Sequence, residues 1–236
     1  MFTTYLLKKI YIYISSAILE ALFPSNSSQN KLYDIPIGKL SLFLKPSPAT
    51  PINHSYSLFA YKDHLTKHFI WNIKYKKNMY MIEHGAYELY KAIEKNTILK
   101  EIFRLTDNEK IILIPIPINA KRRKERGFNQ TELIVNQMKN LDDGDRFIIL
   151  ENLLIRPNNN THQTKQNRKG RLNSAKNIFD IDRDRYKELI FQNPEILNYK
   201  IIIIDDVITT GSTVLSAMNK LLEIKDRDIY ALSIAH

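Results

Sequence analysis

The sequence predicts an α/β fold in which a mainly parallel, twisted sheet is flanked by helices. The first observation is Ile201–Ile204, a run of four isoleucines that is typical of a central parallel strand buried on both faces. Two further apolar stretches, Ile111–Ile118 and Ile229–Ile234, have the length and composition of strands, and helical patterns lie between them. Strands that alternate with helices indicate a parallel sheet.

The composition indicates a globular protein of one domain, or of one domain with a small companion. The chain has 236 residues, of which 44% are hydrophobic and 25% charged. The absence of cysteine excludes a disulfide framework, a cysteine nucleophile and cysteine-ligated zinc. No apolar run reaches the roughly 20 residues of a membrane-spanning helix. The net charge of +10 favours anionic partners such as phosphorylated metabolites or nucleic acid.

The first hundred residues precede the predicted sheet. Residues 1–23 suggest one apolar helix, or a strand at Tyr11–Ile14. Residues 24–57 contain proline, serine and asparagine clusters, which predict irregular structure or short strands. From Leu58 to Arg104 apolar side chains recur at helical spacing, which predicts a helical cap ahead of the sheet.

The rest of the chain divides into elements in a regular order. Ile111–Ile118 is followed by the basic stretch N-A-K-R-R-K-E-R-G-F-N-Q and a helix over Asn129–Lys139, and Arg146–Ile155 is the next strand. Residues 156–177 are almost wholly polar and form either a disordered loop or a mobile functional flap. A short strand at Ile178–Ile181, a charged and partly helical connection over 182–198, the strand from Lys200 with its helix, and the strand Ile229–Ile234 complete the order.

A candidate site follows the strand of isoleucines directly. Asp205 and Asp206 end this strand, and a loop of hydroxyl-bearing residues around one glycine leads from them into an apolar helix; the loop consists of Thr209, Thr210, Gly211, Ser212 and Thr213. The N-terminus of a helix binds phosphate through free N–H groups and the helix dipole, and the carboxylates suit sugar hydroxyls or a metal. A P-loop is excluded because Gly-Lys-Ser/Thr is absent.

The stretch I-I-I-I-D-D-V-I-T-T-G-S-T resembles the signature of the type I phosphoribosyltransferases, in which a hydrophobic strand and two acids precede T-T-G-x-T. The resemblance implies that fold, and binding of 5-phosphoribosyl-1-pyrophosphate (PRPP) with Mg²⁺. Asp205 and Asp206 would hold the ribose hydroxyls and would be the catalytic candidates, with Asp206 as the base. The ribose and 5′-phosphate site would comprise Asp205, Asp206, Val207, Thr209, Thr210, Gly211, Ser212 and Thr213. Magnesium would be bound through the donor near the two aspartates, with no direct protein ligand.

A second motif narrows the resemblance. I-P-I-P-I-N-A-K-R-R-K-E-R-G-F-N-Q (Ile114–Gln130) is similar to the V-P-V-P…R…R-G-F-N-Q element of the ComF family, also called the GntX or competence-protein F group. The resemblance implies that Arg122 or Arg123, together with Arg126, binds pyrophosphate, for which arginine has suitable bidentate geometry. The alternative for so many cations in one turn is a solvated surface loop.

A third stretch, Arg156…Thr161…Gln163…Arg171…Phe179, is similar to the flexible loop that closes over the reaction centre in this family. Thr161 and Gln163 are one residue closer together than in the family pattern, and Ser174 stands where the family usually has asparagine. The cations of this loop would cover the pyrophosphate or contact a nucleic-acid backbone; they are Lys165, Arg168, Lys169 and Arg171.

The resemblance covers residues 55–236, which would form a phosphoribosyltransferase-like domain with a helical hood (55–104) and a core (110–236). Members of the family commonly begin with a four-cysteine zinc module. The chain lacks cysteine, so residues 1–54 would be a degenerate replacement without zinc. Four scattered histidines do not supply such a site; they are His54, His64, His68 and His84. Because the chain ends after the last predicted strand, residues 55–104 would also have to provide the hood over the acceptor.

The resemblance implies a cytoplasmic protein that binds PRPP and supports DNA uptake in natural transformation, with single-stranded DNA and a competence helicase or other DNA-uptake proteins as partners. One alternative is a metabolic phosphoribosyltransferase of the nucleotide-salvage type that releases pyrophosphate. Another is a regulator that senses the donor without turnover. The donor site favours an enzyme, but no acceptor motif can be read in the sequence.

Overall fold

The computed structural model describes residues 32–107, 109–157, 178–225 and 228–236. The chain divides into two compact units, Met1–Pro36 and Ile37–His236. Turns at residues 32–36 are the described part of the first unit, so the prediction for residues 1–23 lies outside the described residues. Everything below concerns the second unit. Among its described helices, none is long and apolar enough to cross a membrane.

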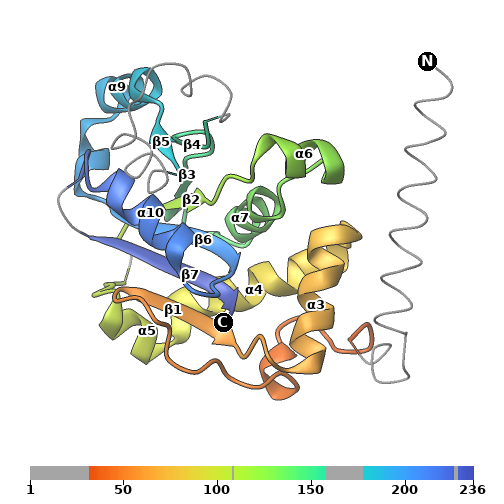
Figure 1. The fold of residues 1–236 in the computed structure, drawn as a ribbon. Coiled ribbons are helices and arrows are strands. Elements are labelled where there is room, and N and C mark those ends of the chain that lie inside the picture. Colours follow the sequence, from red (N-terminus) through yellow and green to blue (C-terminus); the bar gives the residue numbers. More distant parts are fainter. Residues whose placement is uncertain (1–31, 108, 158–177, 226–227) are drawn as a thin grey trace, which may run out of the picture. The chain divides into compact units, whose positions relative to one another are not determined.

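The elements of the second unit alternate between strand and helix over most of the chain (Figure 1). In order they are η1 (Leu40–Leu42), β1 (Ser55–Phe59), α3 (His64–Tyr75), α4 (Met79–Lys95), α5 (Thr97–Ile102), β2 (Ile111–Pro115), α6 (Ala120–Arg126), α7 (Gln130–Asn140), β3 (Phe147–Ile149), β4 (Leu154–Ile155), β5 (Asp180–Ile181), α9 (Arg183–Gln192), η2 (Pro194–Asn198), β6 (Lys200–Val207), α10 (Ser212–Leu221) and β7 (Ile229–Ala235).

Five strands form one parallel sheet in the order β1-β7-β6-β2-β3. The strand of isoleucines, β6, lies at the centre, where Ile112 pairs with Ile201 and Ile202 with Tyr230. Ile201–Ile204 are each at most 3% exposed, which confirms the prediction of a strand buried on both faces. The sheet and its helices are those expected of a type I phosphoribosyltransferase-like fold.

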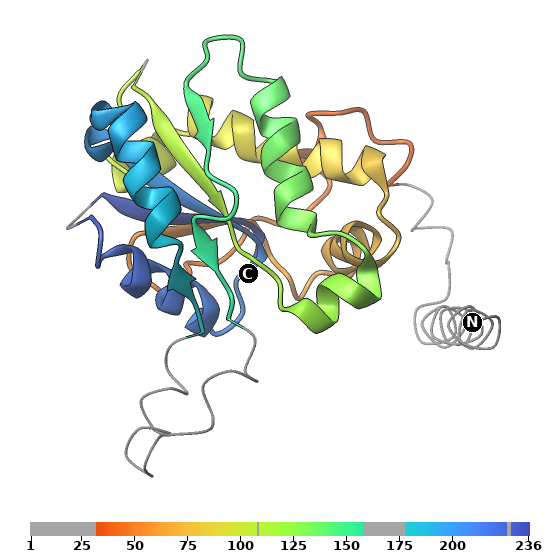
Figure 2. The same ribbon diagram turned by 90° about the horizontal axis from the view of Figure 1, so that it is seen from above.

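Helices cover both faces of this sheet (Figures 1 and 2). α10 packs against β6 and β7 on one face, where Ile201 and Ile203 contribute to its hydrophobic core. α4 and α7 pack against each other and against the other face, over β7, β2 and β6. Because side chains alternate along a strand, Ile202 and Ile204 point to this second face.

The α-helices mostly begin at a side chain that accepts backbone N–H groups. Asp or Asn is the N-cap of every described α-helix except α10; these caps are Asp63, Asn78, Asn96, Asn119, Asn129 and Asp182. Such caps satisfy the free N–H groups of the first helical turn. α10 begins at Gly211 without a side-chain cap.

Three elements differ from the sequence prediction. Helices were predicted from Leu58, but β1 extends to Phe59 and pairs with β7 at the edge of the sheet. The sequence analysis assigns no helix to the basic stretch before Asn129, but this stretch contains the helix α6, which Asn119 caps at its start and Gly127 ends with a φ of 81°.

The predicted strand Arg146–Ile155 is divided into two. β3 belongs to the main sheet, whereas β4 pairs with β5 in an antiparallel two-stranded sheet. Asn152 has a φ of 65° between them, in the left-handed region that ends an extended strand. The ends of this small sheet lead into residues 158–177, which lie outside the described residues.

Candidate functional site

Asp205 and Asp206 lie at the carboxyl end of the central strand β6, as the sequence predicted. They are 9% and 3% exposed, respectively. Asp205 Oδ1 accepts the backbone N–H of Asp206 over 2.8 Å. The carboxyl ends of the central strands are where ligands bind in open α/β sheets, so the pair occupies a position typical of a binding site.

Asp206 is held by two side chains from different elements. Lys74 of α3 places its Nζ 3.0 Å from Oδ1, and Gln130 of α7 donates from Nε2 to Oδ2 over 2.6 Å. Burial lowers the pKa of Lys74, but the charge of Asp206 and its hydrogen bond, together with the charge of Asp205, raise that pKa above its usual value. The pair Lys74–Asp206 therefore behaves as a buried ion pair that Gln130 supports.

The carboxyl of Asp205 binds its proton more tightly than an ordinary aspartate does. Burial and the neighbouring charge of Asp206 raise the pKa of Asp205 to about 8, although the cations Lys74 and Arg122 act in the opposite direction. A buried carboxyl beside a second carboxylate prefers to keep its proton. Asp205 therefore carries a proton over much of the neutral range and can donate a hydrogen bond as well as accept one.

The hydroxyl-rich loop after β6 leads into the N-terminus of α10. Ile208 is buried, and its N–H donates to the carbonyl of Ala235 over 2.9 Å, whereas Thr209 and Thr210 are exposed. Gly211 has a φ of 78° and is the start of the helix. A Cβ on Gly211 would lie 2.1 Å from Cδ1 of Ile52, so both the backbone angle and the packing require glycine.

Polar groups of this loop lie where an anion can reach them. Ser212 is exposed at the first position of α10, and the hydroxyl of Thr210 lies 3.2 Å from that of Ser212. The N–H of Ser212 donates to the Thr210 hydroxyl over 3.5 Å, and a hydrogen bond of this length is weak. Uncapped N–H groups and the positive end of the dipole make this helix start suitable for phosphate.

The arginines predicted to bind pyrophosphate differ in their contacts with other residues of the protein. Arg123 forms an ion pair with Glu132, with Nη1 2.9 Å from Oε2. Arg126 donates to Gln130 Oε1 over 3.1 Å, and its guanidinium lies 4.8 Å from the centre of the Tyr75 ring. Arg122 is exposed, and its charge acts on Asp205 and Arg156. Arg122 is therefore the most available of the three.

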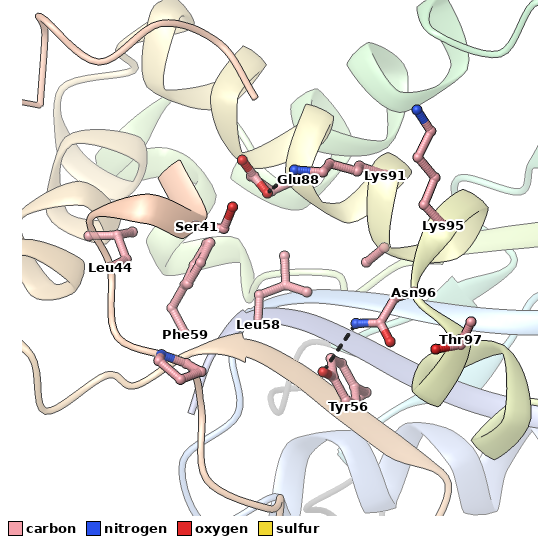
Figure 3. A pocket seen from close by; sticks show the side chains of 12 residues that line it. Ser41, Leu44, Tyr56, Leu58, Phe59, Glu88, Lys91, Lys95, Asn96 and Thr97 are labelled. Carbon is pink, nitrogen blue, oxygen red and sulfur yellow. Dashed lines mark hydrogen bonds and ion pairs between the residues drawn. The ribbon is translucent and has the colours of Figure 1, made fainter. Parts of the chain in front are cut away.

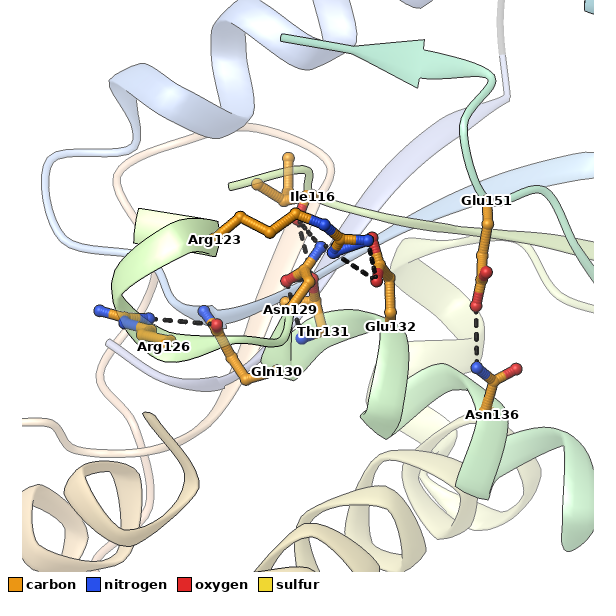
Figure 4. Close-up of polar contacts among 9 residues, drawn as sticks. All are labelled: Ile116, Arg123, Arg126, Asn129, Gln130, Thr131, Glu132, Asn136 and Glu151. Atoms are coloured by element: carbon orange, nitrogen blue, oxygen red, sulfur yellow. Dashed lines mark hydrogen bonds and ion pairs between the residues drawn. The ribbon is translucent and has the colours of Figure 1, made fainter. Parts of the chain in front are cut away.

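The motif R-G-F-N-Q joins the basic helix to the acidic pair, and Figure 4 shows the contacts of its residues Arg126, Asn129 and Gln130 on the side of the basic helix. Asn129 caps α7, and its Nδ2 donates to the carbonyl of Ile116 over 3.1 Å. Thr131 donates to the same carbonyl over 2.8 Å, which fixes the chain after β2. Gln130 then connects Arg126 to Asp206. The motif thus fixes the position of α6 relative to the end of β6.

Arg156 is the described residue of the predicted flexible loop. Its guanidinium lies 5.6 Å from the centre of the Phe179 ring, next to β5. Burial and the charge of Arg122 lower the pKa of Arg156, whereas the charge of Asp205 acts in the opposite direction. Arg156 therefore faces the same region as Arg122 and Asp205. The remaining predicted loop residues, Thr161, Gln163 and Arg171, lie outside the described residues.

A separate hollow of about 460 Å³ lies beside the edge strand β1 (Figure 3). Tyr56 and Leu58 of β1 line it, together with Glu88 and Lys91 of α4. Asn96 donates to the Tyr56 hydroxyl over 3.3 Å at one end. None of the residues predicted to bind the donor lines this hollow.

Two residues at the site were not singled out from the sequence. The sequence identifies Gln130 only as part of the motif R-G-F-N-Q, and Lys74 only as a residue of the helical cap. Lys74 carried no signal, because its contact with Asp206 depends on how α3 packs. Among the described residues, no group of three or more His, Asp or Glu side chains is placed to hold a metal ion.

Comparison with known proteins finds similarity to two curated competence proteins. The chain is 28% identical over 172 residues to competence protein ComFC of Bacillus subtilis, an alignment that covers 73% of this chain and 59% of that protein. It is 32% identical over 110 residues to competence protein F of Haemophilus influenzae, covering 47% of this chain and 43% of that protein. The chain thus spans less than two thirds of either relative's length. No family model matches the chain.

Proposed function

We propose that the chain belongs to the ComF family of competence proteins, to two of which it is similar, and that it binds PRPP at the carboxyl end of β6 and supports DNA uptake in natural transformation. The observation that carries the proposal is the 2.6 Å hydrogen bond from Gln130 to Asp206. It joins R-G-F-N-Q to the acidic pair, and this contact between the two motifs supports the proposal that they form one PRPP site.

Each part of PRPP has a matching group in this arrangement. The 5′-phosphate would bind the uncapped start of α10 and the hydroxyls of Thr210 and Ser212. The ribose hydroxyls would meet Asp205, and the pyrophosphate would meet Arg122, with Arg156 nearby. Both oxygens of Asp206 have protein partners, so we expect Mg²⁺ to be carried by the pyrophosphate, where it neutralises the leaving group.

The test is titration calorimetry of the protein with PRPP and Mg²⁺. We expect saturable binding of one PRPP per chain, and loss of binding in the double variant Asp205→Asn/Asp206→Asn. Circular dichroism of this variant should remain that of the folded protein. Absence of binding by the folded wild-type protein would contradict the proposal.

The proposed role in DNA uptake predicts a second, separate activity. The net charge of +10 favours an anionic partner such as single-stranded DNA. The proposed role adds a competence helicase or other DNA-uptake proteins in the cytoplasm as partners. The double aspartate variant should retain DNA binding, with an affinity that falls steeply as salt is raised. Unchanged transformation after deletion of the gene would argue against this role.

A second candidate function is phosphoribosyl transfer with release of pyrophosphate. The observation that favours it is Asp205, whose raised pKa lets it exchange a proton near neutral pH. In such a reaction a nucleophile attacks C1′ as pyrophosphate leaves, and the protein orients the reactants and stabilises the developing charge. A screen of nucleobases and amines for pyrophosphate release tests this candidate, and no release with any acceptor would favour a donor-sensing protein.

A further inference from the structure

The two aspartates at the end of β6 have different surroundings. Asp206 has one partner on each carboxylate oxygen, Lys74 on Oδ1 and Gln130 on Oδ2, and its side chain is 4% exposed. Asp205 has the backbone N–H of Asp206 as the partner of Oδ1. A carboxylate that already has a cation and an amide donor cannot turn toward a ligand without breaking these contacts.

Lys74 connects the helical cap to the centre of the sheet. It lies in the last turn of α3, and its side chain is 21% exposed. The next residue, Tyr75, lies under the guanidinium of Arg126, which in turn donates to Gln130. Contacts therefore run in a closed ring from α3 to β6, α7, α6 and back to α3, and Lys74–Asp206 is the one ion pair of this ring.

We propose that Lys74 is a positioning residue that gives the two aspartates different tasks. The contacts with Lys74 and Gln130 hold the carboxylate of Asp206 in place, so it has a structural task. The carboxyl of Asp205 is then the one that contacts the hydroxyls of the ligand. The part of the inference that concerns the ligand rests on the proposed function. The division between the two aspartates rests on the contacts alone.

The charged groups around Asp205 and Asp206 determine how the loss of Lys74 would change the pKa of Asp205. The charged groups that act on Asp205 are Asp206 of the same strand, Lys74 of α3, Arg122 of α6 and Arg156, which follows β4. Tyr61 acts on Lys74 as well. Lys74 lowers the pKa of Asp205, whereas Asp206 raises it. Removal of Lys74 should therefore raise that pKa further, and removal of the Asp206 charge should lower it.

The first experiment needs no ligand. The side-chain carboxyl carbons of the full-length protein are followed by NMR between pH 4 and pH 10 in the wild type and in Lys74→Met, Lys74→Arg and Lys67→Met. Lys67 is exposed on the same helix and is the matched control. We expect Asp205 to titrate at higher pH in Lys74→Met, and near the wild-type pH in the other two variants. An unchanged titration in Lys74→Met would overturn the inference.

A second variant covers the case in which Lys74→Met does not fold. Asp206→Asn removes the like charge but keeps the shape of the side chain. It should shift the titration of Asp205 to lower pH. A titration that stays at the wild-type pH in Asp206→Asn would show that the two carboxyls are not coupled, and would also overturn the inference.

The second experiment separates positioning from folding by calorimetry with PRPP and Mg²⁺. Lys74→Met should weaken binding by about tenfold or more at pH 7, since Asp206 loses its support, and should recover part of this loss at pH 9. Lys74→Arg should restore most of the affinity. Because Lys74 acts through Asp206, the double variant Lys74→Met/Asp206→Asn should bind no more weakly than Asp206→Asn alone.

The outcomes distinguish this inference from the proposed function. If the wild-type protein does not bind PRPP, the proposed function is wrong, and the NMR titration alone decides whether Lys74 divides the pair. If the wild-type protein binds PRPP and Lys74→Met binds it equally well at pH 7, the proposed function stands and Lys74 is not a positioning residue.

Discussion

Gly211 packs so closely against Ile52 that a Cβ at position 211 would lie 2.1 Å from the Cδ1 atom of Ile52. Gly211 also has a φ of 78°, in the left-handed region that side chains disfavour. We expect Gly211→Ala to lower the free energy of unfolding by about 1–3 kcal/mol and to weaken PRPP binding, since the loop before α10 must shift. Denaturant unfolding and calorimetry measure the two effects.

The double variant Gly211→Ala/Ile52→Ala serves as the control for this first prediction. It removes the steric overlap but keeps the disfavoured φ, so it should recover only part of the lost PRPP affinity. Full recovery would show that packing alone requires glycine at this position.

Asp205 should make stability depend on pH with an unusual sign. In the unfolded chain an aspartate loses its proton near pH 4, whereas in the folded protein Asp205 keeps it until about pH 8. Between these pH values the folded state binds more protons, so the free energy of unfolding should fall as pH rises. Asp205→Asn should remove this fall, so its stability relative to that of the wild type should increase from pH 4 to pH 8, by at most about 5 kcal/mol.

Urea unfolding at a series of pH values measures this effect, and Asp143→Asn, at an exposed position, is the matched control. A slope that Asp205→Asn leaves unchanged would contradict the prediction.

The arginines of α6 should contribute unequally to donor binding. Arg123 is bound to Glu132, whereas Arg122 is exposed and acts on Asp205 and Arg156. We expect Arg122→Ala to weaken binding of PRPP by about tenfold or more, and Arg123→Ala to change it by less than about threefold. Calorimetry at constant ionic strength compares the two variants. A larger loss in Arg123→Ala would mean that its pair with Glu132 opens when the ligand binds.

Asn129 should be the residue of R-G-F-N-Q that matters most for stability. Its side chain caps α7 and also donates to the buried carbonyl of Ile116. Asn129→Ala should lower the free energy of unfolding by about 2–3 kcal/mol, since it removes a helix cap and leaves a buried carbonyl with fewer donors. Asn136→Ala, an exposed asparagine of the same helix, should cost less than about 1 kcal/mol. Similar losses in the two variants would contradict this account.

Local patterns predicted the strands β2, β6 and β7 and the place of the acidic pair. Ile201–Ile204 form an unbroken apolar run, and only a strand covered on both faces buries such a run. The helix α6 was not predicted because all but one of its residues are charged, so it shows no apolar period. Its caps, Asn119 and Gly127, were visible in the sequence and were the signal that could have identified it.

The contact of Lys74 with Asp206 could not be predicted in the same way. The two residues are far apart in the chain, and α3 contains one further lysine, Lys67, which is exposed. Which lysine pairs with the aspartate depends on how α3 packs against the other helices. Tertiary packing of this kind leaves no local pattern in the sequence.

The pairing of β1 with β7 affects how the protein is made. In the described part of the chain β7 is the only strand that pairs with β1, and the buried hydroxyls of Ser57 and Ser233, which share a 2.6 Å hydrogen bond across this pair, are 176 residues apart in the chain. β1 therefore leaves the ribosome long before its partner exists. Such non-local parallel pairing is slow and leaves apolar strand surface exposed. The nascent chain must consequently carry β1 unpaired until almost the whole of this sequence has been translated.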